Sequence, residues 1–184
     1  MAQTTKRALA ASLKKIMMER SLDKITVTDI TNDCEVNRNT FYYHFNNIYD
    51  LIEWIFEYEG MKAIDGKNTY DTWQQGYQQI LEYVLENREF IYRTYYSISR
   101  EQLEKYLYRE VYGLLLGVVK EKAVGIRMRE DDLEFIANFY KYAFVGYTLE
   151  WIGNGMKEKP EVLVERLSTL IYGDFERALE KLSI

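Results

Sequence analysis

A run of donor, hydroxyl and aromatic side chains occupies the segment RNTFYYH, residues 38 to 44. At helical spacing Phe41 and Phe45 share one face of this segment, which leaves the polar and tyrosine side chains facing outward. A short helix with such an outer face is poorly suited to a protein core and well suited to a DNA groove. The candidates for DNA contact are Arg38, Asn39, Thr40, Tyr42, Tyr43 and His44.

These side chains offer groups that a DNA surface can use, although a plainer reading exists for some of them. Arg38 suits a forked contact with guanine or a simple contact with phosphate. Asn39 suits a paired contact with adenine, or it is a solvated surface residue. Thr40 offers a methyl group to thymine and a hydroxyl to phosphate, while Tyr43 faces bases or sugar. Thr28 stands at the start of the preceding helix, where its hydroxyl is expected to bind a phosphate.

Two short helices joined by a tight turn are expected to position this face. Thr26 is a helix-capping residue and Asp29, three residues later, completes a capping box. The turn is expected at residues 35–37, with Asn37 capping the second short helix. A longer helix is predicted from Thr4 or Thr5 to about residue 20, with an apolar stripe at three- and four-residue steps. This is a helix-turn-helix arrangement.

The remaining chain also carries apolar residues at helical spacing and holds a single proline. We therefore expect an all-α fold of about nine helices. The predicted organisation is a three-helix DNA-binding head at 1–47, a connecting fourth helix at 48–63, and a C-terminal helical bundle at 66–184. Within that bundle the expected helices cover about 73–87, 88–98, 101–122, 132–152, and a last one that begins at Pro160.

Charge divides unevenly along this acidic chain of 184 residues and net charge −5. Residues 1–50 hold seven basic and six acidic side chains, whereas residues 51–184 hold seventeen and twenty-three. Positive charge thus gathers where phosphates would lie. A single cysteine, the absence of a leader pattern and the lack of a long apolar run indicate a soluble, cytoplasmic protein without a membrane span.

Catalytic and metal chemistry are poorly supported by the residue types. Cys34 and His44 are the sole cysteine and histidine, which makes a zinc site very improbable. No nucleophile pairs with a base, and the short acidic clusters fall at helix ends, where they serve as caps. We expect no enzyme activity, no catalytic residue, no metal and no cofactor.

The N-terminal residues resemble the TetR family of bacterial transcriptional regulators. The resemblance rests on ITVTDI (25–30), Val36-Asn37, and the run TFYYHF (40–45) followed by Asn47, Asp50 and Leu51. It implies a homodimer that binds a palindromic operator in double-stranded DNA, with Tyr42 and His44 as phosphate contacts. It also implies control by an effector, commonly as a repressor. Two positions depart from the family pattern: Glu35 replaces a frequent glycine, and Ile48 replaces a frequent lysine.

A narrower resemblance links residues 50–57 and Thr72-Trp73 to the dihydroxyacetone kinase regulator branch, which implies control by a protein partner. Two alternatives therefore stay open: a regulator or coactivator controlled by a protein, and a helical ligand- or protein-binding module without DNA recognition. Tyrosines at inward or boundary positions are candidates for an effector pocket if they do not simply fill the core: Tyr77, Tyr95, Tyr112 and Tyr147. By resemblance the last two helices form the dimer interface, with candidates Tyr140, Phe144, Leu167, Leu170, Ile171 and Phe175.

Overall fold

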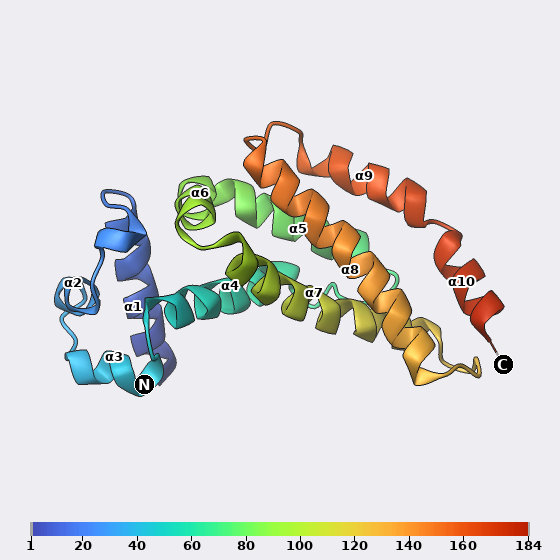
Figure 1. The fold of residues 1–184 in the computed structure, drawn as a ribbon, viewed down its shortest axis with the longest axis horizontal. Helices are drawn as coiled ribbons and strands as arrows, with labels where there is room; N and C mark the ends of the chain where they lie inside the picture. Colours follow the sequence, from blue (N-terminus) through green and yellow to red (C-terminus); the bar gives the residue numbers. More distant parts are fainter. Residues whose placement is uncertain (1, 184) are drawn as a thin grey trace. The chain divides into compact units, whose positions relative to one another are not determined.

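The computed structural model describes residues 2–183, and within this range every regular element is a helix (Figure 1). The all-α prediction is confirmed. None of these helices is long and apolar enough to cross a membrane. The helices are α1 (Ala2–Met17), the 3-10 helix η1 (Leu22–Lys24), α2 (Val27–Asp33), α3 (Arg38–His44), α4 (Ile48–Ile64), α5 (Trp73–Glu86), α6 (Arg88–Ser97), α7 (Arg100–Lys122), α8 (Glu130–Gly153), α9 (Pro160–Ile171) and α10 (Asp174–Leu182).

The described chain divides into two compact units that do not follow sequence order. Unit 1 holds residues 2–60 together with 87–100, and unit 2 holds 61–86 together with 101–183. Helix α6 belongs to unit 1 because it packs against α1 and η1. At the start of α6, Lys14 Nζ of α1 donates to Asn87 Oδ1 over 2.8 Å, and the Phe90 ring lies 5.8 Å from the Phe56 ring of α4.

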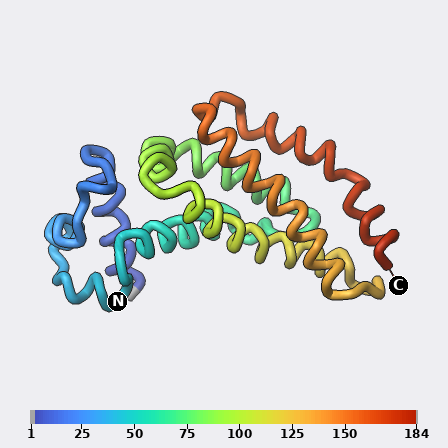
Figure 2. Tube along the Cα trace, viewed as in Figure 1, coloured from blue at the N-terminus to red at the C-terminus, as the bar shows by residue number. Residues whose placement is uncertain are grey.

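Unit 1 is built on the apolar stripe of α1, whose Leu9, Leu13 and Met17 are fully buried. Figure 2 shows the short α2 and α3 following α1 in sequence and connected by a tight turn. Helix α1 begins at Ala2, ahead of the expected cap at Thr4 or Thr5. The capping expectation there was wrong, because both threonines lie inside the first turns of the helix.

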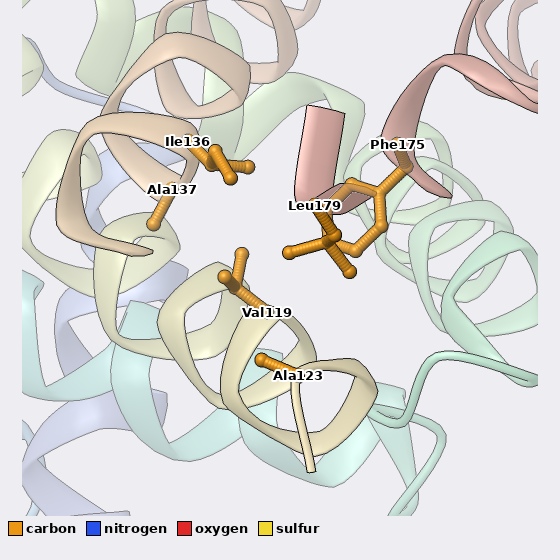
Figure 3. Packing of buried hydrophobic residues seen from close by; sticks show 6 residues of the cluster. All are labelled: Val119, Ala123, Ile136, Ala137, Phe175 and Leu179. Carbon is orange, nitrogen blue, oxygen red and sulfur yellow. The ribbon is translucent and has the colours of Figure 1, made fainter. Parts of the chain in front are cut away.

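Unit 2 has a core cluster in which α8 and α10 meet the C-terminal end of α7. Val119 and Ala123 come from α7 and the residue that follows it, Ile136 and Ala137 from α8, and Phe175 and Leu179 from α10. Figure 3 shows these side chains gathered together. The single expected helix after Pro160 is two helices, since Gly173 adopts a left-handed φ of 77° between α9 and α10. This break lets Phe175 and Leu179 turn into the cluster.

Two helical glycines of unit 2 provide a matched test of packing. A Cβ on Gly76 in α5 would overlap the backbone carbonyl oxygen of Lys67, whereas a Cβ on Gly113 in α7 would meet nothing within 4 Å. We expect Gly76→Ala to lower the free energy of unfolding by about 1–3 kcal/mol through overpacking. Gly113→Ala is expected to raise it by about 0.5–1 kcal/mol, because alanine loses less backbone entropy in a helix. Urea denaturation measures both; equal effects would contradict the close approach at Gly76.

Candidate nucleic-acid interface

Helix α2 begins with the capping box that the sequence predicts. The Asp29 backbone N–H donates to Thr26 Oγ1 over 3.2 Å, and the Thr26 N–H donates to Asp29 Oδ2 over 2.8 Å. These hydrogen bonds satisfy two amides that the first turn of a helix leaves without partners. Donation from the Thr26 hydroxyl and backbone lowers the pKa of Asp29. The stabilisation is therefore present at neutral pH and is lost on acidification through that lowered pKa.

The turn between α2 and α3 is held by backbone hydrogen bonds and one side-chain cap. The Val36 N–H donates to the Thr31 carbonyl over 3.0 Å, which closes the turn over the end of α2. Asn37 Oδ1 then accepts the Asn39 N–H over 2.8 Å and starts α3 as predicted. Within this turn Glu35 has a φ of 55°, a left-handed conformation that residues with a Cβ rarely adopt.

The inner side of α3 is fixed by aromatic residues. Phe41 is fully buried and Phe45 is 5% exposed, with 5.8 Å between their ring centroids. Helix α3 packs on α2, which in turn packs on α1. The buried Ser12 hydroxyl on α1 donates to the Ile30 carbonyl of α2 over 3.0 Å. The reading face is thus one side of a closely packed three-helix arrangement.

The outer side of α3 carries the residues that the sequence singled out. Tyr43 is 82% and Tyr42 46% exposed, and Arg38 and Asn39 are also exposed, while Thr40 is half-buried. The half-buried His44 ring lies 4.9 Å from the Tyr43 ring in an edge-on arrangement, and Thr28 is exposed on α2. The structure therefore gathers six candidates on α3 and places Thr28 on the neighbouring helix. Their contact with DNA stays a prediction.

Arg38 and Tyr42 form a pair that sequence reasoning missed. Arg38 Nη2 donates to the Tyr42 hydroxyl over 3.1 Å, and the guanidinium lies 5.5 Å from the centre of the Tyr42 ring. The spacing i, i+4 on a helix is the signal that predicts such a pair. Tyr42 therefore orients the Arg38 side chain in the free protein. A substitution of Tyr42 is expected to change the position of the Arg38 guanidinium.

The four tyrosines proposed for an effector pocket lie on four different helices, α5, α6, α7 and α8, and their role stays a prediction. Tyr77 donates or accepts a 2.9 Å hydrogen bond with Thr148 Oγ1, and burial raises the pKa of its phenol to about 12. Tyr112 packs against the core cluster of unit 2, and Tyr147 is 48% exposed. Tyr95 belongs to unit 1, where its hydroxyl accepts from Arg100 Nη1 over 3.0 Å. Tyr77 is half-buried and has a polar partner in Thr148.

The six residues proposed for the dimer interface also differ in their surroundings. Phe144, Leu167 and Phe175 are 8%, 4% and 5% exposed and are buried within unit 2, and their place at an interface stays a prediction. The apolar stripes of α9 and α10 contribute buried residues to their own unit. Tyr140 and Ile171 are partly buried against the core cluster. Leu170 keeps 66% of its surface exposed.

A set of exposed aromatic side chains on α8 was not anticipated from the sequence. Phe135, Phe139 and Tyr142 are 67%, 62% and 57% exposed. Their spacing of four and three residues places them on one face of the helix. Gly146 continues this face one turn further, with open space over its Cα. From the sequence, Tyr140 and Phe144 were the interface candidates on this helix, and these exposed residues were not among them.

Residues 71–173, more than half of the chain, match the family model described as "Transcriptional regulator C-terminal region" of the TetR class. With the helix-turn-helix geometry of unit 1, this match identifies the class of protein as a transcriptional regulator rather than an enzyme. The chain belongs to the TetR family.

One curated protein and two solved structures are similar to this chain. The chain is 28% identical over 167 residues to the HTH-type dhaKLM operon transcriptional activator DhaS of Lactococcus lactis subsp. lactis (strain IL1403), which covers 89% of this chain and 88% of that relative. The fold of the present chain is similar to the solved structure of the dihydroxyacetone kinase operon activator DhaS, with a TM-score of 0.71, 23% identity and 98% of each chain covered. It is also similar to NalD, the secondary repressor of the MexAB-OprM multidrug efflux pump in Pseudomonas aeruginosa, with a TM-score of 0.60, 11% identity and coverage of 97% and 98%.

The left-handed turn residue gives a stability test of the site. Glu35→Gly is expected to raise the free energy of unfolding by up to about 1 kcal/mol, since glycine removes the left-handed strain at the cost of more unfolded-state entropy. Glu35→Ala removes the same charge and keeps the strain, so it should bring no such gain. Urea denaturation of the two variants decides the matter. An equal gain from both would assign the effect to charge and contradict backbone strain.

Proposed function

We propose that this protein is a sequence-specific DNA-binding transcriptional regulator that reads its operator with α3. The observation that carries the proposal is the two-sided character of this helix. Phe41 is fully buried on one side, while Arg38, Asn39 and Tyr43 are exposed on the other. A recognition helix in a helix-turn-helix protein needs this combination, because its inner face must be fixed while its outer face enters the major groove.

The proposed roles divide between bases and backbone. Arg38 and Asn39, at the N-terminal end of α3, are assigned to base edges, where guanine and adenine present matching acceptors and donors. Tyr43 is assigned to bases or sugar. Tyr42 and His44 are assigned to phosphates. Thr40 is assigned to both, with its methyl group on thymine and its hydroxyl on a phosphate. The Thr28 hydroxyl of α2 provides a further phosphate contact.

We further propose that the protein acts as a homodimer through unit 2. The exposed aromatic face of α8 is the strongest support, because large apolar patches on a soluble protein mark interaction surfaces. Gly146 on that face leaves room for the close approach of a second helix. Leu170 on α9 is exposed as well, and it is one of the residues that the sequence assigned to the interface. A dimer presents two copies of α3 to a palindromic operator about one helical turn apart.

Control is proposed to reside in residues 66–184, through an effector that shifts the protein between states with different DNA affinity. Repression is the expectation from the sequence. Activation is the second candidate, and it is favoured by the name of the curated relative, a transcriptional activator that matches along 89% of this chain. The effector is a small molecule or a protein. Purification of the full-length protein from its own cells separates these two, because a protein effector would copurify in a fixed ratio.

Selection of bound duplexes from a random DNA pool tests the proposed function as a whole. A palindromic consensus is the expected result. Recovery of no enriched sequence, together with binding that does not weaken as salt rises, would favour the rival class of a helical binding module without DNA recognition.

Substitutions on α3 test the assignment of the reading head. Arg38→Ala is expected to weaken binding to the selected duplex by about 5- to 150-fold, equivalent to about 1–3 kcal/mol for a forked contact. Tyr42→Phe should weaken it less, because it removes the hydroxyl that accepts from Arg38 and is assigned to a phosphate, but it keeps the ring beside the guanidinium. Gel-shift titration at fixed salt measures both, and Arg127→Ala, an exposed arginine of unit 2, is the matched control. Unchanged affinity for both head variants would rule out the assignment.

Charge placed on the proposed dimer face tests the homodimer. Phe139→Glu and Leu170→Glu are expected to give a monomer in sedimentation velocity, because each would bury an unpaired carboxylate in the interface. Val124→Glu is the control, since this side chain is 81% exposed outside the α8 face. Dimers that persist in both variants at micromolar concentration would place the interface elsewhere.

A further inference from the structure

The basic side chains of residues 2–60 separate into two groups by their partners. Three of the seven are in ion pairs with carboxylates: Lys14 with Glu59 at 2.8 Å, Lys15 with Asp33 at 2.5 Å and Arg20 with Asp29 at 3.3 Å. The other four have no carboxylate within 4 Å among the described residues: Lys6, Arg7, Lys24 and Arg38. The positive charge of this segment that no carboxylate pairs with therefore lies on the second group.

Lys6 is distinguished within this group by what holds it. Its Nζ lies 5.4 Å from the centre of the Phe45 ring and 5.7 Å from the centre of the Trp54 ring. These rings are themselves 6.0 Å apart, and Phe45 is almost fully buried. A ring face attracts a cation without cancelling its charge, unlike a carboxylate. The ammonium group is thus fixed in place and keeps its full charge for another partner.

The position of Lys6 relative to the proposed reading helix is informative. Arg38 is the first residue of α3, and Phe45, the ring beneath Lys6, directly follows the last residue, His44. Lys6 therefore places its cation beside the C-terminal end of a seven-residue helix, about 10 Å long at 1.5 Å per residue, whereas the Arg38 side chain extends from the first residue to Tyr42. The major groove is about 12 Å wide between its two phosphate backbones. A cation beside the C-terminal end of a helix that lies in this groove is within reach of one phosphate backbone, while Arg38 faces the bases.

We infer that Lys6 binds a backbone phosphate of the operator at the C-terminal end of α3, opposite the end marked by Arg38. The inference rests on the proposed DNA-binding function and adds a residue of α1 to it. Phe45 and Trp54 act as positioning residues, because they hold the ammonium group and contact no DNA themselves. A phosphate contact of this kind strengthens binding to every sequence equally and carries no base specificity.

The test compares the salt dependence of DNA binding for Lys6→Met with that of Lys24→Met, a control that removes an exposed lysine of η1. The duplex recovered by selection and a random duplex of the same length are the two probes. For Lys6→Met we expect the plot of log K against log salt to become shallower: the magnitude of its negative slope should decrease by about 0.9, the value for one phosphate contact. Affinity for both duplexes at about 0.1 M salt should fall about fivefold to tenfold. Lys24→Met should leave slope and affinity as in the wild type.

Lys6→Arg and thermal unfolding separate binding from a structural role. Arginine keeps the charge and the ring contacts, so its slope should equal that of the wild type. A lysine that merely supports Phe45 and Trp54 would change the unfolding temperature and leave the slope unchanged, which would overturn the inference. A wild-type slope for Lys6→Met beside weakened binding by Arg38→Ala would overturn it while sparing the proposed function. Failure of the wild type to bind either duplex would overturn both.

Discussion

Helix α3 is too short to be stable in water by itself, and the reading head depends on the burial that holds it in place. Seven residues form few of the hydrogen bonds that offset the cost of starting a helix. The missing stability comes from Phe41, whose full burial is worth about 1.5–3 kcal/mol. The Asn37 cap adds roughly 1 kcal/mol at the N-terminal end. Because the inner face carries the stability, the outer face is free to carry chemistry.

Aromatic rings also position many of the cationic side chains. Several Lys and Arg side chains of this protein lie over aromatic rings, mostly those of tyrosines. Some of them also pair with a carboxylate and others, within the described part of the chain, do not. Lys141 Nζ lies 4.5 Å from the centre of the Tyr142 ring and 5.3 Å from that of Tyr108, and Lys122 Nζ lies 3.9 Å from the Tyr70 ring. This use explains part of the high tyrosine content, seventeen of 184 residues. Tyrosine fills half-buried space and orients a cation while leaving the cation charged.

Local patterns predicted most of the helices and the starts of α2, α3 and α9, because these depend on neighbours in sequence. The capping box at Thr26, the cap at Asn37 and the first position of Pro160 are all set by residues three or fewer positions apart. The break at Gly173 escaped notice because its flanking stripe continues at helical spacing on both sides. Only the left-handed φ of that glycine reveals it.

Site residues beyond the head were harder to predict for a different physical reason. An apolar position on a helix indicates burial, but it does not say whether the covering surface belongs to the same subunit, a second copy or a ligand. Phe144 illustrates this: its ring packs edge-on against Tyr77 and Trp73, at 4.8 and 5.5 Å, inside its own unit. Phe139, five residues earlier on the same helix, is 62% exposed. Periodicity assigns both to helix faces, and only packing tells the faces apart.

An acidic protein that binds DNA needs a local excess of positive charge more than a favourable total. The net charge of −5 is a sum over the whole surface of the protein, whereas a phosphate interacts only with the charges near it. Screening at physiological salt limits the range of each charge's interaction to about 8 Å. What matters is the set of cations beside α3 that carboxylates have not neutralised. Arg38 is oriented by Tyr42, and Lys6 by Phe45 and Trp54. The aromatic residues around α3 thus support the proposed function twice, by fixing the helix and by keeping its cations charged.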